Sequence, residues 1–274
     1  MLVIHIITFK NYSARQACAL FKLNRGTFKY QAIKSDDSEI IELVKRIAES
    51  KPRWGFGKIV QWLKHQGYTW NHKRIRRIYC ELKLNHRIKP KKRLPNREPK
   101  PLVVPDQQNR TWSMDFMTDS LESGKKFRTL NIIDDYNREI LAVEIDYSLP
   151  AERVIRVLNR VAEERGLPEE IRVDNGPEFI SIKLELWAES HQIRLENIKP
   201  GKPAQNAYIE RFNRTYREDV LDMYLFQSLN DVRDITTEWM YEYNNERPHS
   251  SLGGIPPREL LTHPFNISLL LTGT

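Results

Sequence analysis

The chain has 274 residues, a formal net charge of +8 and a pI near 9.4, and this charge is concentrated in one segment. Residues 51–100 carry sixteen Lys and Arg against two acidic side chains, a balance of +14, which leaves −6 for the rest of the chain. With 40% hydrophobic residues the chain can bury a core, so it is not a disordered tail, and no apolar stretch reaches the roughly 18 residues of a membrane-spanning helix. A basic block of this kind predicts a polyanionic partner, with nucleic acid the leading candidate.

The two cysteines point to a reducing compartment. Cys18 and Cys80 are too few for a disulfide framework, and neither has a second Cys at zinc-binding spacing. The N-terminus also lacks the basic region and the cleavage site of a secretory signal. We therefore expect a cytoplasmic protein with reduced thiols, no membrane association and no zinc.

Residues 1–34 are predicted to hold a short helix-turn-helix-like segment. Ser13 and Gln16 have the spacing of a capping box, and Ala17, Cys18 and Phe21 follow at helical spacing. A plain helical hairpin that does not touch DNA is an equally good interpretation of this pattern.

Residues 35–86 are predicted to form a basic helical DNA-binding unit. Apolar residues at helical spacing indicate helices around Ile47 and Leu63, and Asn71 can cap a third helix. This third helix has an apolar stripe that includes Ile75 and Ile78. Its other faces carry Lys73, Arg74, Arg76 and Arg77. Such a helix suits contact with DNA phosphates, although a solvated basic face is the alternative.

Residues 87–106 are predicted to be a linker, because they are rich in proline and basic residues and show no periodicity. From residue 107 strand patterns replace helical ones. Strands over 111–117, 127–133 and 140–147 are joined by short turns, which predicts an antiparallel meander.

After the third strand, predicted helices and strands alternate along the chain. A helix over 151–165, a strand over 171–173, a helix over 182–191, a strand over 193–198 and a long helix from about residue 205 follow. This order predicts an α/β core with a mixed sheet and helices on its faces, covering residues 107–265 with its C-terminal helices, and residues 266–274 are a tail.

Three acidic residues lie where this core should expose them. Asp115 lies within the first strand, Asp174 ends the fourth, and Glu210 comes early in the long helix. Phosphodiester chemistry uses pairs of divalent cations, and these hard ions take carboxylate oxygens as ligands. Taken singly, Asp174 could merely begin an Asp-Asn-Gly turn and Glu210 could be a solvated helix acid. Together, the three predict a metal-dependent phosphodiester site.

The motifs around these acids resemble a known family. The segments WSMDF, VDNGPEF and NAYIERFNRTYR, with 35 residues between Asp174 and Glu210, resemble the Asp, Asp, Glu signature of the integrase-core superfamily, which includes retroviral integrases and bacterial transposases. The segments PRWGFGKIVQWL, KPGKPAQNAYIE and YNNERPHSSLGGIPP resemble OrfB-type transposases of bacterial insertion sequences. The resemblance covers roughly residues 10–260.

The resemblance implies an RNase H-like core in which Asp115, Asp174 and Glu210 are the catalytic residues and hold two Mg²⁺ or Mn²⁺ ions. The implied activity is DNA strand cleavage and strand transfer at insertion-sequence ends, that is, DNA integration and recombination. A non-catalytic DNA-binding inhibitor or remnant of transposition is the alternative function. Lys202, Asn206 and Arg217 are implied DNA contacts, although Asn206 also suits a helix cap.

Other features of the family bear on structure and partners. The Asp134-Asp135 turn resembles a family motif for which a structural role is favoured over metal binding, and His249 suits either a loop anchor or a DNA contact. The resemblance implies a bacterial, cytoplasmic protein that acts on DNA as a homo-oligomer. An upstream OrfA-type protein, separate or joined by a frameshift, is the further partner implied.

Overall fold

The computed structural model describes residues 2–30, 36–85, 104–174, 176, 179–198 and 206–262. Most of the predicted linker, Lys202 and the predicted tail lie outside the described residues. The chain divides into two compact units, Met1–Leu43 and Val44–Thr274. Within the described ranges, no helix combines the length and the apolar character needed to cross a membrane.

The first unit holds three short helices, α1 (Leu2–Lys10), α2 (Ala14–Leu20) and α3 (Arg25–Lys29). The predicted capping box at the start of α2 is confirmed, because the Ser13 side chain accepts from Gln16 N while the Gln16 side chain accepts from Ser13 N. A small core of Val3, Ala17 and Cys18 holds α1 against α2. Helix α1 was not predicted from the sequence.

Three further helices follow: α4 (Ser38–Ser50), which crosses the boundary between the units, α5 (Phe56–His65) and α6 (His72–Glu81). Asn71 caps α6 as expected, accepting from Lys73 N at 2.9 Å. Ile59 and Leu63 of α5 and Ile75 and Ile78 of α6 are buried, and α5 contacts α6. The polar faces of α6 are therefore left for solvent or for a ligand.

A five-stranded mixed sheet forms the centre of the second unit. Strands β1 (Thr111–Ser120), β2 (Lys126–Asp134) and β3 (Ile140–Asp146) make the predicted antiparallel meander. Strands β4 (Glu170–Val173) and β5 (Arg194–Asn197) continue the sheet in parallel with β1, in the order β3-β2-β1-β4-β5. Strand β1 runs three residues beyond its predicted end and lies in the middle of the sheet.

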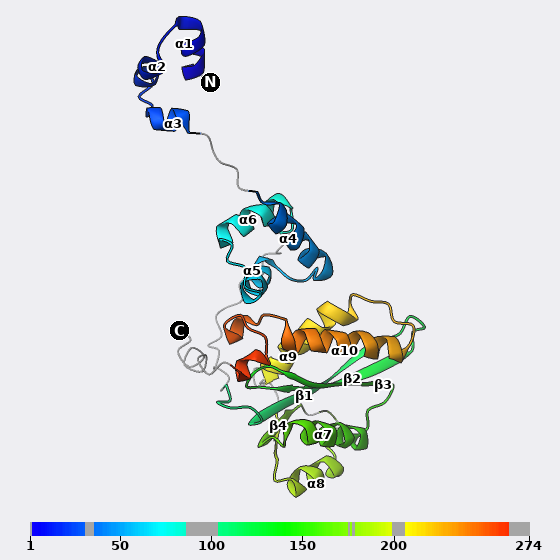
Figure 1. Ribbon diagram of the computed structural model, residues 1–274. Coiled ribbons are helices and arrows are strands. Elements are labelled where there is room, and N and C mark those ends of the chain that lie inside the picture. Colours follow the sequence, from blue (N-terminus) through cyan, green and yellow to red (C-terminus); the bar gives the residue numbers. More distant parts are fainter. Residues whose placement is uncertain are drawn as a thin grey trace, which may run out of the picture. The chain divides into compact units, whose positions relative to one another are not determined.

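Helices cover both faces of this sheet (Figure 1). Helices α7 (Ala151–Arg165) and α8 (Ile182–Ser190) pack on one face, and α9 (Ala207–Tyr216) and α10 (Leu229–Asn245) pack on the other. A π-helix, η2 (Arg217–Leu221), continues α9, and two 3₁₀-helices, η3 (Ser250–Leu252) and η4 (Glu259–Leu261), follow α10.

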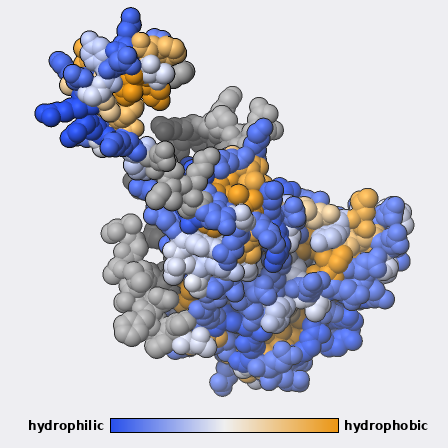
Figure 2. Space-filling model, turned by 45° about the horizontal axis from the view of Figure 1, so that its top comes forward, coloured by the Kyte–Doolittle hydropathy of each residue, from blue (hydrophilic) through white to orange (hydrophobic). Residues whose placement is uncertain are grey.

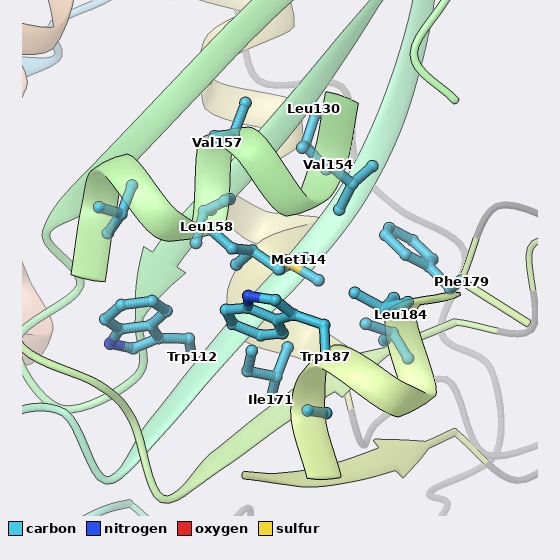
Figure 3. Close-up of a cluster of buried hydrophobic side chains, with 14 of the residues drawn as sticks. Trp112, Met114, Leu130, Val154, Val157, Leu158, Ile171, Phe179, Leu184 and Trp187 are labelled. Atoms are coloured by element: carbon cyan, nitrogen blue, oxygen red, sulfur yellow. The ribbon is translucent and has the colours of Figure 1, made fainter. Parts of the chain in front are cut away.

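The alternation of side chains along β1 decides which residue faces which layer. Trp112 and Met114 belong to the core beneath α7 and α8 (Figure 3). Asp115 therefore points to the opposite face, toward α9. There Ile209, Phe212 and Tyr216 of α9 pack in a second core with Trp239 of α10. The polar side of α9 is thereby fixed next to the middle of β1.

The surface of the molecule is mainly polar, as expected from a chain with 29% charged residues. In Figure 2 hydrophilic residues cover most of the face shown, and hydrophobic residues form several separate patches. Large apolar side chains such as Ile182 and Leu225 are among the exposed ones.

Candidate active site

Asp115 lies in the middle of β1 and is held by two hydrogen bonds. Its Oδ1 accepts from Phe116 N at 2.8 Å, and its Oδ2 accepts from Asn213 Nδ2 of α9 at 2.7 Å. Asn213 Oδ1 in turn accepts from Asn131 Nδ2 at 2.7 Å, and Asn131 is the residue directly opposite Asp115 in the β1–β2 ladder. This chain of amides joins β1, β2 and α9 at the position of the first acid.

Asp174 follows the last residue of β4, and the parallel pairing of β4 with β1 places it beside Asp115. The last paired residues are Ser113 and Arg172, and the same offset two residues further on puts Asp174 opposite Asp115. Neighbouring strands lie about 4.8 Å apart, so the two carboxylates belong to one edge of the sheet. Asp174 Oδ1 also accepts from Gly176 N at 2.9 Å, the Asp-Gly turn that the sequence indicated.

Glu210 lies in the first turn of α9, three residues before Asn213 and on the same helical side. Its side chain is exposed. Within the described part of the chain it has no hydrogen-bond or ion-pair partner, so its carboxylate can adopt other rotamers. The contact of Asn213 with Asp115 therefore brings Glu210 to the side of the sheet that Asp115 faces.

The negative charges of Asp174 and Glu210 both act on Asp115. Burial, followed by the negative charge of Asp174, raises the pKa of Asp115 to about 6, and the charge of Glu210 contributes in the same direction. The hydrogen bonds from Phe116 and Asn213 oppose this rise. Among the residues that the structure describes, no Lys or Arg forms an ion pair with any of the three carboxylates. Within the described ranges, the negative charge around Asp115 therefore has no paired cation.

The chemistry of these side chains fits a hard divalent cation, which prefers carboxylate oxygens. Within the described ranges, no three Asp, Glu, His or Cys side chains are gathered tightly enough to make a ready set of metal ligands. The exposed Glu210 and the negative charges of Asp174 and Glu210 that act on Asp115 are the features that suit a cation at this place.

The three residues implied to contact DNA have different surroundings in the structure. Arg217 donates to Asp119 Oδ2 at 3.1 Å and to Thr118 O at 3.0 Å, which ties η2 to the end of β1. Asn206 precedes α9, but its side chain does not cap the helix, and its Oδ1 is buried without a hydrogen-bond partner among the described residues. Lys202 lies outside the described residues. A DNA role for these three stays a prediction.

The basic face of α6 is formed as the sequence indicated. Lys73, Arg76 and Arg77 are exposed and Arg74 is half-buried. Arg77 pairs with Glu81 at 2.9 Å, one helical turn away, and the Arg76 guanidinium lies 5.4 Å from the centre of the Phe56 ring. Four cations on one short helix provide positive charge for a polyanion.

The Asp134-Asp135 turn makes structural contacts. Asp134 accepts from Asn109 N and Tyr136 N, both at 2.8 Å, and Asp135 pairs with Arg172 at 2.8 Å. Both acids are fully buried. The structural role that the sequence favoured for them is confirmed.

Comparison with known proteins identifies the family. Residues 105–203 and residues 191–257 each match an integrase core domain family, and residues 35–92 match an HTH-like domain family. An insertion element IS476 protein of 39.2 kDa from Xanthomonas euvesicatoria is 36% identical over 248 residues, covering 90% of this chain and 72% of that protein. An insertion element IS407 protein of 31.7 kDa from Burkholderia multivorans is 35% identical over 250 residues, covering 91% of this chain and 90% of that protein. The chain belongs to the integrase-core transposases of bacterial insertion elements.

The fold of this transposase agrees with a solved relative. A chain in the structure of the simian T-cell lymphotropic virus intasome with the PP2A regulatory subunit B56 gamma aligns with a TM-score of 0.50 and 14% identity, covering 81% of this chain and 75% of that chain. The predicted fold, an RNase H-like mixed sheet preceded by helical units, is confirmed, and so is the predicted family. The general role of the transposase is in DNA integration.

Sequence reasoning missed the two amides that hold Asp115 in this transposase. Asn213 shares the side of α9 that carries Glu210, but no contact with Asp115 was predicted for it or for Asn131. A signal was present, because Asn131 is a polar residue inside an otherwise apolar strand segment, opposite a strand acid. Buried polar residues need hydrogen-bond partners, and the available partners come from the neighbouring acid and helix.

Proposed function

We propose that this protein is a divalent-metal-dependent polynucleotidyl transferase that cleaves DNA strands at the ends of its insertion sequence and joins them to target DNA. The proposal is supported by the places of the three acids in the fold. Asp115 faces α9 from β1, Asp174 follows the strand β4 that pairs with β1, and Glu210 lies on the side of α9 that carries Asn213.

In this proposal Asp115, Asp174 and Glu210 hold two Mg²⁺ or Mn²⁺ ions. Bound ions of this kind activate the attacking oxygen and stabilise the leaving oxygen of a phosphodiester. Support for this role comes from Asn213, which binds Asp115 from α9, and from β4, which pairs with β1 and ends directly before Asp174. Glu210 is exposed and has no partner among the described residues, so a change of rotamer brings its carboxylate into the ligand set.

DNA binding is shared between two regions in the same proposal. Lys73, Arg74, Arg76 and Arg77 of α6 contact backbone phosphates, and Lys202, Asn206 and Arg217 contact DNA near the acids. The phosphate contacts make affinity strongly salt-dependent. The protein acts as a homo-oligomer on DNA, together with an OrfA-type protein or fused to it.

The test is a cleavage and joining assay with the full chain, duplexes that carry the element's terminal repeats, and Mg²⁺ or Mn²⁺. We expect cleaved and covalently joined products that disappear with EDTA and with Asp174→Asn. Losing one of three carboxylates should lower turnover by orders of magnitude while DNA affinity changes little, because the acid acts on the transition state. Asp234→Asn, an exposed acid on α10, is the matched control and should be fully active.

Other outcomes would point elsewhere. Full activity of Asp174→Asn, with its fold confirmed by circular dichroism, would refute the catalytic assignment. Binding of end duplexes without any cleavage would favour the non-catalytic DNA-binding alternative. Cleavage without a joined product would identify a nuclease instead.

A further inference from the structure

A second polar cavity lies on the opposite side of α9 from the acids. With 3.6 residues per turn, Tyr208, Arg211 and Thr215 face away from Glu210 and Asn213. These three residues line a cavity of about 230 Å³. The other walls come from Lys58 of α5, from Arg138 in the β2–β3 turn, and from the segment between α10 and η3 with Arg247 and His249.

This cavity collects positive charge from four separate segments. Lys58, Arg138, Arg211 and Arg247 are its cations, and we call these four residues together with His249 the cationic pocket. No acidic side chain is found among the described residues that line the pocket. Asp219, outside the lining, pairs with Arg247, and the Arg138 guanidinium lies 3.3 Å from the centre of the Tyr208 ring.

All four cations affect the pKa of His249. Burial is the largest cause that holds the pKa of His249 well below its usual 6.5, and the charges of Arg247, Lys58, Arg138 and Arg211 follow. Burial and the charge of Arg247 likewise lower the pKa of Lys58 to about 8, against opposing effects of Asp219 and Glu218. The pocket therefore carries more positive charge than the protein neutralises.

Two buried polar atoms of the pocket lack a hydrogen-bond partner in the described structure, Arg138 Nη1 and His249 Nε2. Buried polar groups are nearly always paired, and an unpaired one costs about 1–3 kcal/mol. The backbone of His249 is occupied in holding its loop, since His249 N donates to Ile255 O and its carbonyl accepts from Leu252 N and Gly254 N. His249 Nε2 and Arg138 Nη1 are left to bind a ligand, although both side chains also contact aromatic rings, Tyr243 and Tyr208 respectively.

We propose that the cationic pocket binds a backbone phosphate of DNA, so that α9 contacts the nucleic acid on two opposite sides. Guanidinium groups bind phosphate oxygens through paired, charge-assisted hydrogen bonds, and three arginines meet here. The rim is open, because Arg211, Ser250 and Ser251 are exposed, so the phosphate of a polymer can enter. This inference rests on the proposed DNA substrate, but it adds a binding site separate from the acids.

The experiment measures equilibrium binding of a labelled end duplex at several salt concentrations, with all variants made in the Asp174→Asn protein so that no reaction occurs. Arg211→Gln removes an exposed cation of the pocket. Thr215→Leu fills the cavity without changing charge. The matched controls are Arg156→Gln, an exposed arginine on α7, and Thr237→Leu on α10, because Thr215 and Thr237 both donate to the carbonyl four residues earlier.

We expect Arg211→Gln to flatten the slope of log K against log salt by about 0.9, the value for one lost phosphate contact, and to weaken binding roughly three- to tenfold at moderate salt. Thr215→Leu should weaken binding to a similar extent, because the phosphate no longer enters. Both controls should bind as the parent protein does. Thermal melting checks that each variant is folded.

Three results would overturn the proposal. One is an unchanged slope and affinity for Arg211→Gln and Thr215→Leu, and another is an equal loss in the controls. The third result comes from an experiment that distinguishes free phosphate from the phosphate of DNA, in which inorganic phosphate is added at constant ionic strength. If it binds in an Arg211-dependent way while the DNA slope is unaltered, the pocket takes the free ion and not DNA. None of these results bears on Asp174, so the proposed catalytic function is tested separately.

Discussion

Replacing Asp115 by Asn should stabilise the metal-free protein at pH 7.5, although it removes a proposed metal ligand. Burial first, and then the charges of Asp174 and Glu210, raise the pKa of Asp115 from 3.8 to about 6. A rise of about 2 pKa units means that ionisation of this side chain destabilises the folded state by about 3 kcal/mol. The carboxylate accepts hydrogen bonds from Phe116 and Asn213, and an amide keeps one of them, which costs about 1 kcal/mol. The expected net gain is about 2 kcal/mol.

This gain must change with pH in a defined direction. Below about pH 3.8 Asp115 is protonated in both the folded and the unfolded chain, so its ionisation costs nothing. As the pH rises from 3.8 toward 6, the unfolded chain ionises first and the wild-type protein loses stability, and the loss is complete above about pH 6. The stability of Asp115→Asn relative to wild type should therefore fall by about 2 kcal/mol between pH 7.5 and pH 4.5.

Urea denaturation with EDTA at both pH values measures this difference, with Asp234→Asn as the control for loss of an exposed carboxylate. Added Mg²⁺ should raise the melting temperature of the wild type and leave that of Asp115→Asn unchanged. A stability difference that is the same at pH 7.5 and pH 4.5 would show that Asp115 is not in a repulsive environment. The reasoning about the three acids would then be wrong.

Two further predictions concern the support of the site and the basic helix. Asn213→Leu removes the partner of Asp115 Oδ2 and of Asn131 Nδ2, so we expect a loss of about 1–3 kcal/mol in urea denaturation and a large loss of strand transfer with DNA affinity retained. Unchanged activity would mean that the amide does not position Asp115. Replacing Lys73 and Arg76 together by Gln should flatten the salt slope of DNA binding by about 0.9 per lost contact, while Lys45→Gln on α4 should not. A slope that stays as it was would identify the α6 surface as a solvated face.

Much of the fold could be predicted because the apolar residues of its helices and strands recur at the spacing that puts them on one face. Helix α7 has its apolar residues at helical spacing and was predicted with the bounds found. In the structure Trp112 and Met114 face one core, and the half-buried Asp115 lies on the other side of β1. Asp174 and Glu210 lie where an element ends or begins, as these patterns indicated, whereas Asp115 lies in the middle of β1.

The features that could not be predicted depend on contacts between distant residues. The π-helix η2 has no sequence signal of its own. It is held by Arg217, which reaches back to Asp119, and by Asp219, which pairs with Arg247. Asn206 is of a residue type that often caps helices, yet its side chain is buried and does not cap α9. Helix α1 is apolar on several sides, with Leu2, Ile4 and Phe9 exposed, so it lacks the single apolar face on which prediction relies.

The central place of β1 also determines when the protein becomes complete during its synthesis. Strands β1, β2 and β3 follow one another and can pair as soon as they are made, because their contacts are local. Glu210 and Asn213 come much later, since Glu210 follows Asp115 by 95 residues. A growing chain on the ribosome therefore has the helical N-terminal region and most of the sheet before α9 docks on β1. An interrupted chain that ends before α9 therefore carries the basic helices without the complete set of acids.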